Sequence, residues 1–212
     1  VSAAGPHVEI HLISKDGRPV LSSEGLLLTP GTGFAGCPDL DVLCLPGGAG
    51  VIPLFDDLET HAFLRAKAEN CRYLCSVCTG SLVLGAAGLL RGYRATTHWL
   101  SKDLLPLFEA KPQPERVVRD GNRITAAGVC AGIDMALLLA GLLWGDDAAR
   151  AIQLKLEYAP EPPYSAGSPE SAPPETVQAL RSDMAELQAA RRQAALEAAA
   201  RHGFAPPSAG RD

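Results

Sequence analysis

Two short apolar runs, each followed directly by a glycine-containing turn, limit the folds open to this chain more than any other feature. Residues 41–46 lead into the turn at 47–50, and residues 72–77 lead into the turn at 78–80. Apolar runs of this length are typical of strands buried on both faces of a parallel sheet. Helices are expected after them, at 58–70 and 81–90. Alternating strands and helices predict an α/β fold with a mostly parallel sheet, in which ligands bind at the carboxyl ends of the strands.

The remaining segments continue this order. Residues 8–13 alternate apolar and polar side chains as a half-buried strand does, and residues 21–28 are expected to form another short strand region. The turn sequence at 120–122 separates two β-type segments and predicts a hairpin. The other expected elements are a strand at 94–97, hairpin strands at 117–118 and 123–125, a short helix at 100–108, and helices at 132–143 and 146–158.

The length of 212 residues suits one main domain, and a hydrophobic content of 47% is ordinary for a globular protein. We assign residues 1–158 to the α/β domain. Residues 159–175 are rich in Pro, Ser and Gly and predict an extended connector. Residues 176–201 are rich in Ala and predict one long helix of the same domain, while residues 202–212 are expected to be a disordered tail.

Charge and apolar patterning exclude some classes of partner. A formal net charge of -5 without a dense Lys/Arg cluster argues against nucleic-acid binding. The N-terminus lacks the order of a signal peptide, and the richest apolar stretch, 135–144, is too short to cross a bilayer, so no membrane partner is expected. These features favour a cytoplasmic protein whose six cysteines are mostly reduced thiols.

Cys78 is the candidate nucleophile because it is placed where a strand ends and a helix begins. The free N–H groups and the positive dipole end of a helix stabilise a thiolate there. Cys75 competes for this role, because a C-x-x-C pair at a helix start is also found in dithiol oxidoreductases. We expect Cys75 to lie inside the strand and to pack in the sheet. The pair lacks a second pair of ligands, so no metal site is predicted.

Four other residues could assist Cys78, and each has a simpler alternative. The Thr79 hydroxyl could bond the substrate or thiolate, or it could cap the helix. The Gly48 N–H could stabilise an anion, or Gly48 could only form a tight turn. His98 could pair with the cysteine, or it could be a buried histidine with structural hydrogen bonds. Asp134 could act as a base, but balancing its helix is the more common role for such a residue.

Several motifs together resemble one superfamily. They are Leu45-Pro46-Gly47-Gly48, Ser76-Val77-Cys78-Thr79-Gly80-Ser81, Ala86-Ala87-Gly88-Leu89-Leu90 and Ala95-Thr96-Thr97-His98-Trp99. These motifs resemble the ThiJ/PfpI superfamily, which implies a flavodoxin-like, class I glutamine amidotransferase-like fold with helices on both faces of the sheet. The segments 119–122, 131–134 and, most specifically, 153–169 resemble the isonitrile hydratase family, and the likeness runs from about residue 8 to about residue 175.

The resemblance implies that an isonitrile is hydrated to an N-substituted formamide, without metal or organic cofactor, through a thioimidate on Cys78. Thr79 and the Gly48 N–H would be its partners in the site. Val129 and Cys130 fall on the helix-start segment that flanks the nucleophile, and His98 would give possible support.

One part of the family pattern has no counterpart in this sequence. Family members carry an acidic residue after the first strand, whereas this chain is expected to begin at the second strand. Neither Glu9 nor Asp16 fits, because Glu9 falls within a predicted strand and Asp16 in the turn that follows. Two explanations stay open: the sequence starts late, or the polypeptide lacks this segment.

The long terminal helix is expected to dock on a partner subunit, which predicts a homodimer. Two other functions stay open. Similar domains precede DNA-binding regions in some transcription regulators, which suggests a ligand-sensing module. Peptidase, chaperone or deglycase chemistry on the same cysteine is the other.

Overall fold

The computed structural model describes residues 8–22 and 25–205. Its centre is a four-stranded sheet in the order β3-β4-β8-β7. The strands are β3 (Val42–Leu45), β4 (Tyr73–Val77), β8 (Arg123–Ala126) and β7 (Val117–Asp120). Val42 pairs with Tyr73 and Leu74 with Arg123 in parallel register, whereas β7 and β8 form the antiparallel hairpin expected from the turn at 120–122. The mostly parallel α/β sheet is therefore confirmed, with β3 at one edge within the described residues.

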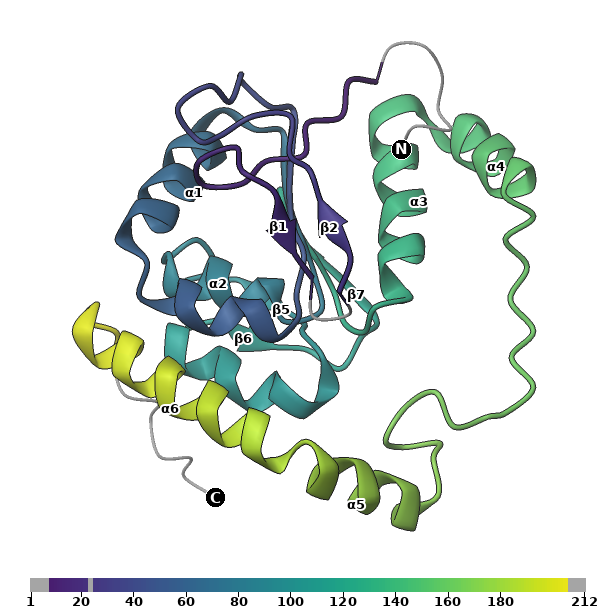
Figure 1. The fold of residues 1–212 in the computed structure, drawn as a ribbon. Helices are drawn as coiled ribbons and strands as arrows, with labels where there is room; N and C mark the ends of the chain where they lie inside the picture. Colours follow the sequence, from purple (N-terminus) through teal and green to yellow (C-terminus); the bar gives the residue numbers. More distant parts are fainter. Residues whose placement is uncertain (1–7, 23–24, 206–212) are drawn as a thin grey trace.

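Helices cover both faces of this sheet, as Figure 1 shows for α1 and α2 against α3. On one face, α1 (Leu58–Asn70), α2 (Gly80–Ala86) and the 3-10 helices η2 (Ala49–Phe55) and η3 (Trp99–Phe108) contribute to the larger core. On the other face, α3 (Ala131–Trp144) packs Met135 and Leu139 near Cys75 and Ile124. Helix α4 (Asp146–Lys155) lies against α3.

The helix predicted at 58–70 is confirmed as α1. Its first turn is stabilised by a side-chain cap. The Asp57 side chain accepts hydrogen bonds from the N–H groups of Glu59 and Thr60, which have no partner inside the helix. The strand predicted at 94–97 is shorter, β5 (Arg94–Ala95), and pairs in parallel with β6 (Lys111–Pro112).

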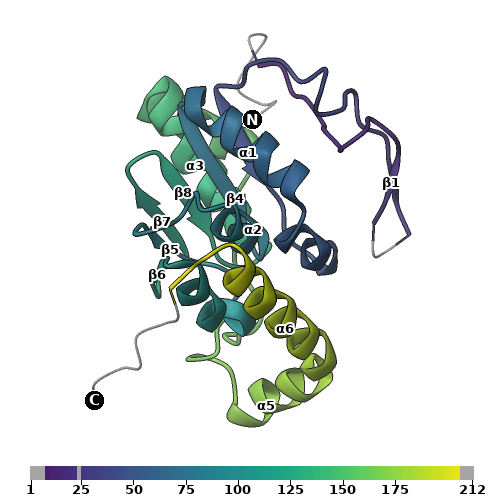
Figure 2. The same cartoon turned by 90° about the vertical axis from the view of Figure 1, so that its left-hand side faces the viewer.

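The strand predicted at 8–13 is wrong. Only Ile13 makes a single bridge, to Thr32, while Ile10 and Leu12 are exposed. Residues 21–28 form part of a small hairpin, β1 (Val20–Leu21) with β2 (Leu27–Leu28), and residues 23–24 lie outside the described chain. Figure 2 shows β1 far from the central sheet. Among the described residues, the segment at 8–14 makes only two backbone hydrogen bonds to its neighbour, from Gly31 N–H to the Leu12 carbonyl and from Ser14 N–H to the Thr32 carbonyl, which is too short a ladder for a strand.

The single helix predicted at 176–201 is also wrong, because the chain breaks at Met184 into α5 (Pro174–Asp183) and α6 (Ala185–Arg201). Ser182 and Asp183 precede the break, and their side chains compete with helical hydrogen bonding. The connector predicted at 159–175 has no helix or strand up to residue 173, and its last two residues belong to α5.

The terminal helix does not need a partner subunit to dock on, because α6 packs against η2 and η3 of its own chain. Figures 1 and 2 both show α5 and α6 along one end of the molecule. Phe204 is buried and meets Phe108 edge-on at a centroid distance of 5.5 Å, so packing extends past residue 202, where the tail is predicted to begin. Residues 206–212 of that predicted tail lie outside the described chain.

Candidate functional site

Cys78 follows β4 directly and adopts a left-handed backbone conformation with φ 56°. Two glycines let the chain turn this sharply. A Cβ on Gly80 would collide with the carbonyl oxygen of Leu45, and a Cβ on Gly47 would collide with the Thr79 N–H and the Cys78 side chain. The loop after β3 and the start of α2 thus approach each other more closely than any side chain would allow.

The backbone at Cys78 is held by hydrogen bonds on both sides. Its N–H donates to the carbonyl of Ala126 at 2.9 Å, beyond the end of the β4–β8 pairing. Its carbonyl accepts from the Thr97 hydroxyl at 2.9 Å and the Ser81 hydroxyl at 3.2 Å. The half-buried thiol is therefore presented from a fixed turn, at the carboxyl end of a parallel strand.

Cys75 lies where the sequence predicts, in the packing between the sheet and α3. Its side chain is fully buried, and burial raises the pKa of the Cys75 thiol to about 12. A thiol held in its neutral form is a poor nucleophile. All six cysteines are free, so Cys75 and Cys78 do not form a disulfide.

The structure brings Thr79 and Gly48 together. The Gly48 N–H donates to Thr79 Oγ1 at 3.1 Å, and that hydroxyl lies 3.3 Å from the Gly48 carbonyl oxygen. Thr79 makes no side-chain cap for α2, so the alternative of a plain helix cap is not what the structure shows. The Gly48 N–H is occupied by the hydroxyl, whereas the Thr79 N–H makes no backbone hydrogen bond among the described residues.

His98 lines the same pocket as Cys78 but is held by a local contact. Its Nδ1 accepts from the Leu100 N–H at 3.4 Å at the start of η3, and no hydrogen bond joins it to Cys78 within the described chain. Burial, together with the positive charge of Arg191, lowers the pKa of His98. The neutral ring therefore serves as a wall of the pocket.

The segment before α3 contributes Val129 to the pocket, where its side chain is largely exposed at the rim. Cys130 is not brought to Cys78, since its sulfur accepts from Arg116 Nη2 at 3.3 Å. Asp134 pairs with Arg116 and accepts from the Tyr158 hydroxyl at 2.7 Å. Burial acts to raise the pKa of the Asp134 carboxyl, but these two partners hold it below its usual range. Asp134 thus stabilises the start of α3 away from the thiol.

The pocket over Cys78 has a volume of about 300 Å³ and mostly apolar walls. The contributing segments are the Gly48 loop, the elbow, η3 and the two terminal helices. The residues from the terminal helices are Leu180, Met184, Leu187, Gln188 and Arg191. Sequence reasoning missed all of these, because it placed the terminal helix on a partner subunit.

Arg191 is the least expected of them. Its side chain is 4% exposed, yet it carries a charge on a helix whose other buried residues, Ala195, Ala198 and Ala199, are small. The spacing of these residues places them on one helical face, and this spacing is the signal that could have identified a buried arginine.

Within the described residues, no group of three or more His, Cys, Asp or Glu side chains could hold a metal ion. No helix in the described part of the chain is long and apolar enough to cross a membrane.

The parallel sheet with helices on both faces, and a cysteine in a strand-to-helix elbow below a pocket, define an α/β protein of the cysteine-elbow type. The chain belongs to the DJ-1/PfpI family, which matches residues 3–141.

Relatives of known structure or function agree with this placement. The isonitrile hydratase of Pseudomonas putida is 58% identical over 181 residues, which make up 85% of this chain and 79% of that protein. The crystal structure of a ThiJ/PfpI family protein from Pseudomonas syringae has a TM-score of 0.85 at 44% identity, covering 88% of this chain and 78% of that chain. The transcriptional regulator GbdR of Pseudomonas aeruginosa is 40% identical over 152 residues, 70% of this chain but 41% of the regulator.

Proposed function

We propose that this protein hydrates isonitriles to N-substituted formamides, with Cys78 as the nucleophile. The observation that carries the proposal is the 58% identity to an isonitrile hydratase over 85% of the chain. The geometry is consistent with it, because the elbow thiol faces a mostly apolar pocket that suits an uncharged R–N≡C molecule.

The chemistry needs one thiolate, a proton donor for the isonitrile carbon and nitrogen, and an acceptor for the protons of the attacking water. The Cys78 thiolate adds to the terminal carbon of R–N≡C, and protonation of that carbon gives the thioimidate R–N=CH–S–Cys. Water then adds to the same carbon while the nitrogen takes up a proton. Collapse of the adduct breaks the C–S bond while its hydroxyl group gives up a proton, which releases the thiolate, leaves R–NH–CHO and returns the proton taken up in the first step. One water is consumed, and no electrons are gained or lost.

We assign the other residues by their position around the thiol. The Thr79 N–H, at the start of α2, is a donor for negative charge that develops on the substrate. Gly48 and the Thr79 hydroxyl fix the loop beside it. Val129 contacts the R group at the rim, His98 supports the wall, and Cys130 belongs to the turn next to Val129. The reaction as proposed uses no cofactor.

Purified protein incubated with cyclohexyl isocyanide should release N-cyclohexylformamide, followed by NMR. Cys78→Ala should abolish turnover, whereas Cys75→Ala, a matched change of a buried thiol, should keep most of it. Full activity of the Cys78 variant would refute the site, and the absence of formamide with several isonitriles would refute the function.

A ligand-sensing role is the second candidate, favoured by the 40% identity to GbdR. The two functions differ in one measurement. A sensor would bind an isonitrile or another small molecule, detected by calorimetry, without consuming it, whereas the enzyme releases product.

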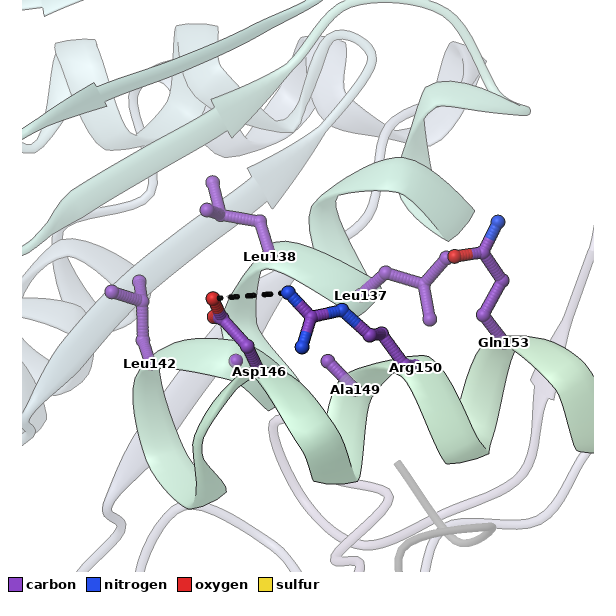
Figure 3. A pocket seen from close by; sticks show the side chains of 8 residues that line it. Leu137, Leu138, Leu142, Asp146, Ala149, Arg150 and Gln153 are labelled. Carbon is purple, nitrogen blue, oxygen red and sulfur yellow. Dashed lines mark ion pairs between the residues drawn. The ribbon is translucent and has the colours of Figure 1, made fainter.

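We further propose a homodimer formed through α3 and α4. Leu138 and Trp144 of α3 and Leu154 of α4 are exposed, and such apolar surface favours burial in an interface. A hollow lies between the two helices, where leucines of α3 face Ala149 and Arg150 of α4 (Figure 3). Light scattering should give the mass of two chains, and Leu138→Asp should shift it to one. A monomeric unsubstituted protein would contradict this.

The six free cysteines support a cytoplasmic location, because thiols stay reduced there. Fractionation of cells that produce the protein, followed by thiol counting, tests both statements. Recovery outside the cytoplasm would contradict the assignment.

A further inference from the structure

Arg191 lies in the pocket wall on α6, close to the thiol in space and far from it in sequence. Its side chain is 4% exposed, whereas the neighbouring Arg192 is largely in solvent and pairs with Asp103. Adjacent arginines of one helix therefore have opposite environments.

The Arg191 guanidinium is held by uncharged groups only. Nη1 donates to the Ser101 hydroxyl at 3.2 Å, and Nη2 lies 3.5 Å from the Gly48 carbonyl oxygen. The Ser101 hydroxyl in turn donates to Gln188 Oε1 at 3.0 Å. Nε is buried and meets no acceptor, and no carboxylate pairs with this side chain, within the described residues. Burying a cation without a counter-ion costs several kcal/mol.

Few ionisable side chains face the Arg191 guanidinium. The ionisable side chains lining the pocket are Cys78 from the elbow, His98 before η3 and Arg191 itself. Helix α5 contributes only Leu180, the break after it contributes Met184, and the segment before α3 contributes Val129. Arg181 lies over the Trp99 ring, while Arg116 donates to both Asp134 and Cys130. Cys78 is thus the one lining side chain in the described pocket that can become an anion.

We propose that Arg191 is the charge partner of the Cys78 thiolate: a positioning residue, held by Ser101 and Gly48, whose buried positive charge favours the ionised nucleophile. The interaction is through space and needs no hydrogen bond, because two opposite charges attract more strongly when one of them is removed from water, as the Arg191 guanidinium is. The effects on the pKa of Arg191 are consistent with this pairing: burial lowers that pKa, whereas the nearby Cys78 acts to raise it.

The test is the pH dependence of iodoacetamide alkylation at Cys78, read by peptide mass spectrometry. It needs no turnover, so it stays valid if the hydratase proposal fails. Arg191→Gln should move the half-maximal pH upward by about 1 unit, which slows alkylation roughly tenfold at neutral pH. Arg191→Lys keeps the charge and should stay near the unsubstituted protein.

Three comparisons make the result specific. Arg191→Met removes the charge while filling the space, and a buried charge replaced by an apolar residue often folds as well or better. Arg192→Gln is the same change at the exposed neighbour and should leave the midpoint unmoved. Cys130, exposed in the same protein, should alkylate identically in every variant.

One outcome would overturn the proposal: an unmoved Cys78 midpoint in a folded neutral variant, either Gln or Met. If the KM of that variant also rises for isocyanoacetate but not for cyclohexyl isocyanide, Arg191 binds an acidic group of the substrate instead.

Discussion

The Thr79 hydroxyl and the Gly48 N–H are joined by a hydrogen bond of 3.1 Å between two loops that are 31 residues apart in the chain. One loop follows β3 and the other follows β4, so this contact fixes the relative position of two neighbouring strand ends. The residue beside the thiol therefore also anchors the opposite wall of its pocket.

Thr79→Val should remove this anchor while keeping the shape of the side chain. Because the Gly48 N–H then loses its side-chain acceptor in a partly buried contact, we expect a stability loss of about 0.5–1.5 kcal/mol. Turnover should fall roughly tenfold, since an error in positioning raises the barrier. Thr79→Ser keeps the hydroxyl and should retain most of both quantities, measured by urea unfolding and formamide release. Equal behaviour of the Val and Ser variants would contradict the anchor.

Gly80→Ala should disrupt the elbow. The new Cβ would meet the Leu45 carbonyl oxygen, and backbone at both places would have to move. We expect loss of activity and a clear fall in melting temperature. Gly50→Ala is the matched control, because nothing lies within 4 Å of a Cβ there. If the two alanine variants melted alike, the close approach would not be needed.

The free energy of unfolding should fall in mild acid because of His61, which is buried, and His98, which is partly buried. Burial lowers the pKa of His61 and of His98 in the folded state, while the unfolded chain keeps values near 6.5. Below about pH 6.5 the unfolded state therefore binds protons that the folded state does not, and stability drops until the folded pKa is reached. Urea midpoints between pH 7.5 and about pH 5 measure this.

His61→Gln should flatten that pH dependence. Its side-chain amide can still donate to the Leu54 carbonyl, which His61 Nε2 meets at 2.8 Å, but it does not titrate. A variant whose urea midpoints decline as steeply as those of the unsubstituted protein would show that His61 is not involved.

Phe204→Ala should loosen the end of α6. Its ring is buried against Phe108, and removing a buried phenylalanine ring costs about 3–5 kcal/mol. The loss should spread to the pocket, because the same helix carries Gln188 and Arg191. Hydrogen exchange of α6 amides should accelerate more than that of β4 amides. Uniform acceleration across the chain would indicate global destabilisation only.

The parts of the fold with strong local signals could be predicted from the sequence. Helix 58–70 begins after a capping Asp57, and the turn after residue 77 has the glycines that a sharp elbow requires. These signals are short-range, so they do not depend on what the rest of the chain does.

The wrong predictions concern contacts that a local pattern does not encode. The alternation at 8–13 shows which side chains share a face, but not whether a strand lies beside them. Arginine side chains are usually exposed, so the residue type alone does not predict the burial of Arg191, and the role of the terminal helices depends on where they fold back.

The left-handed backbone at Cys78 has an evolutionary consequence. A residue other than glycine in this left-handed conformation destabilises the fold by about 1–2 kcal/mol, so Cys78 lowers the stability of the protein at this position. Selection for thermal tolerance alone would replace it with glycine at this position. Under the proposed function, a descendant in which glycine replaces Cys78 should be more stable and should no longer turn over isonitriles.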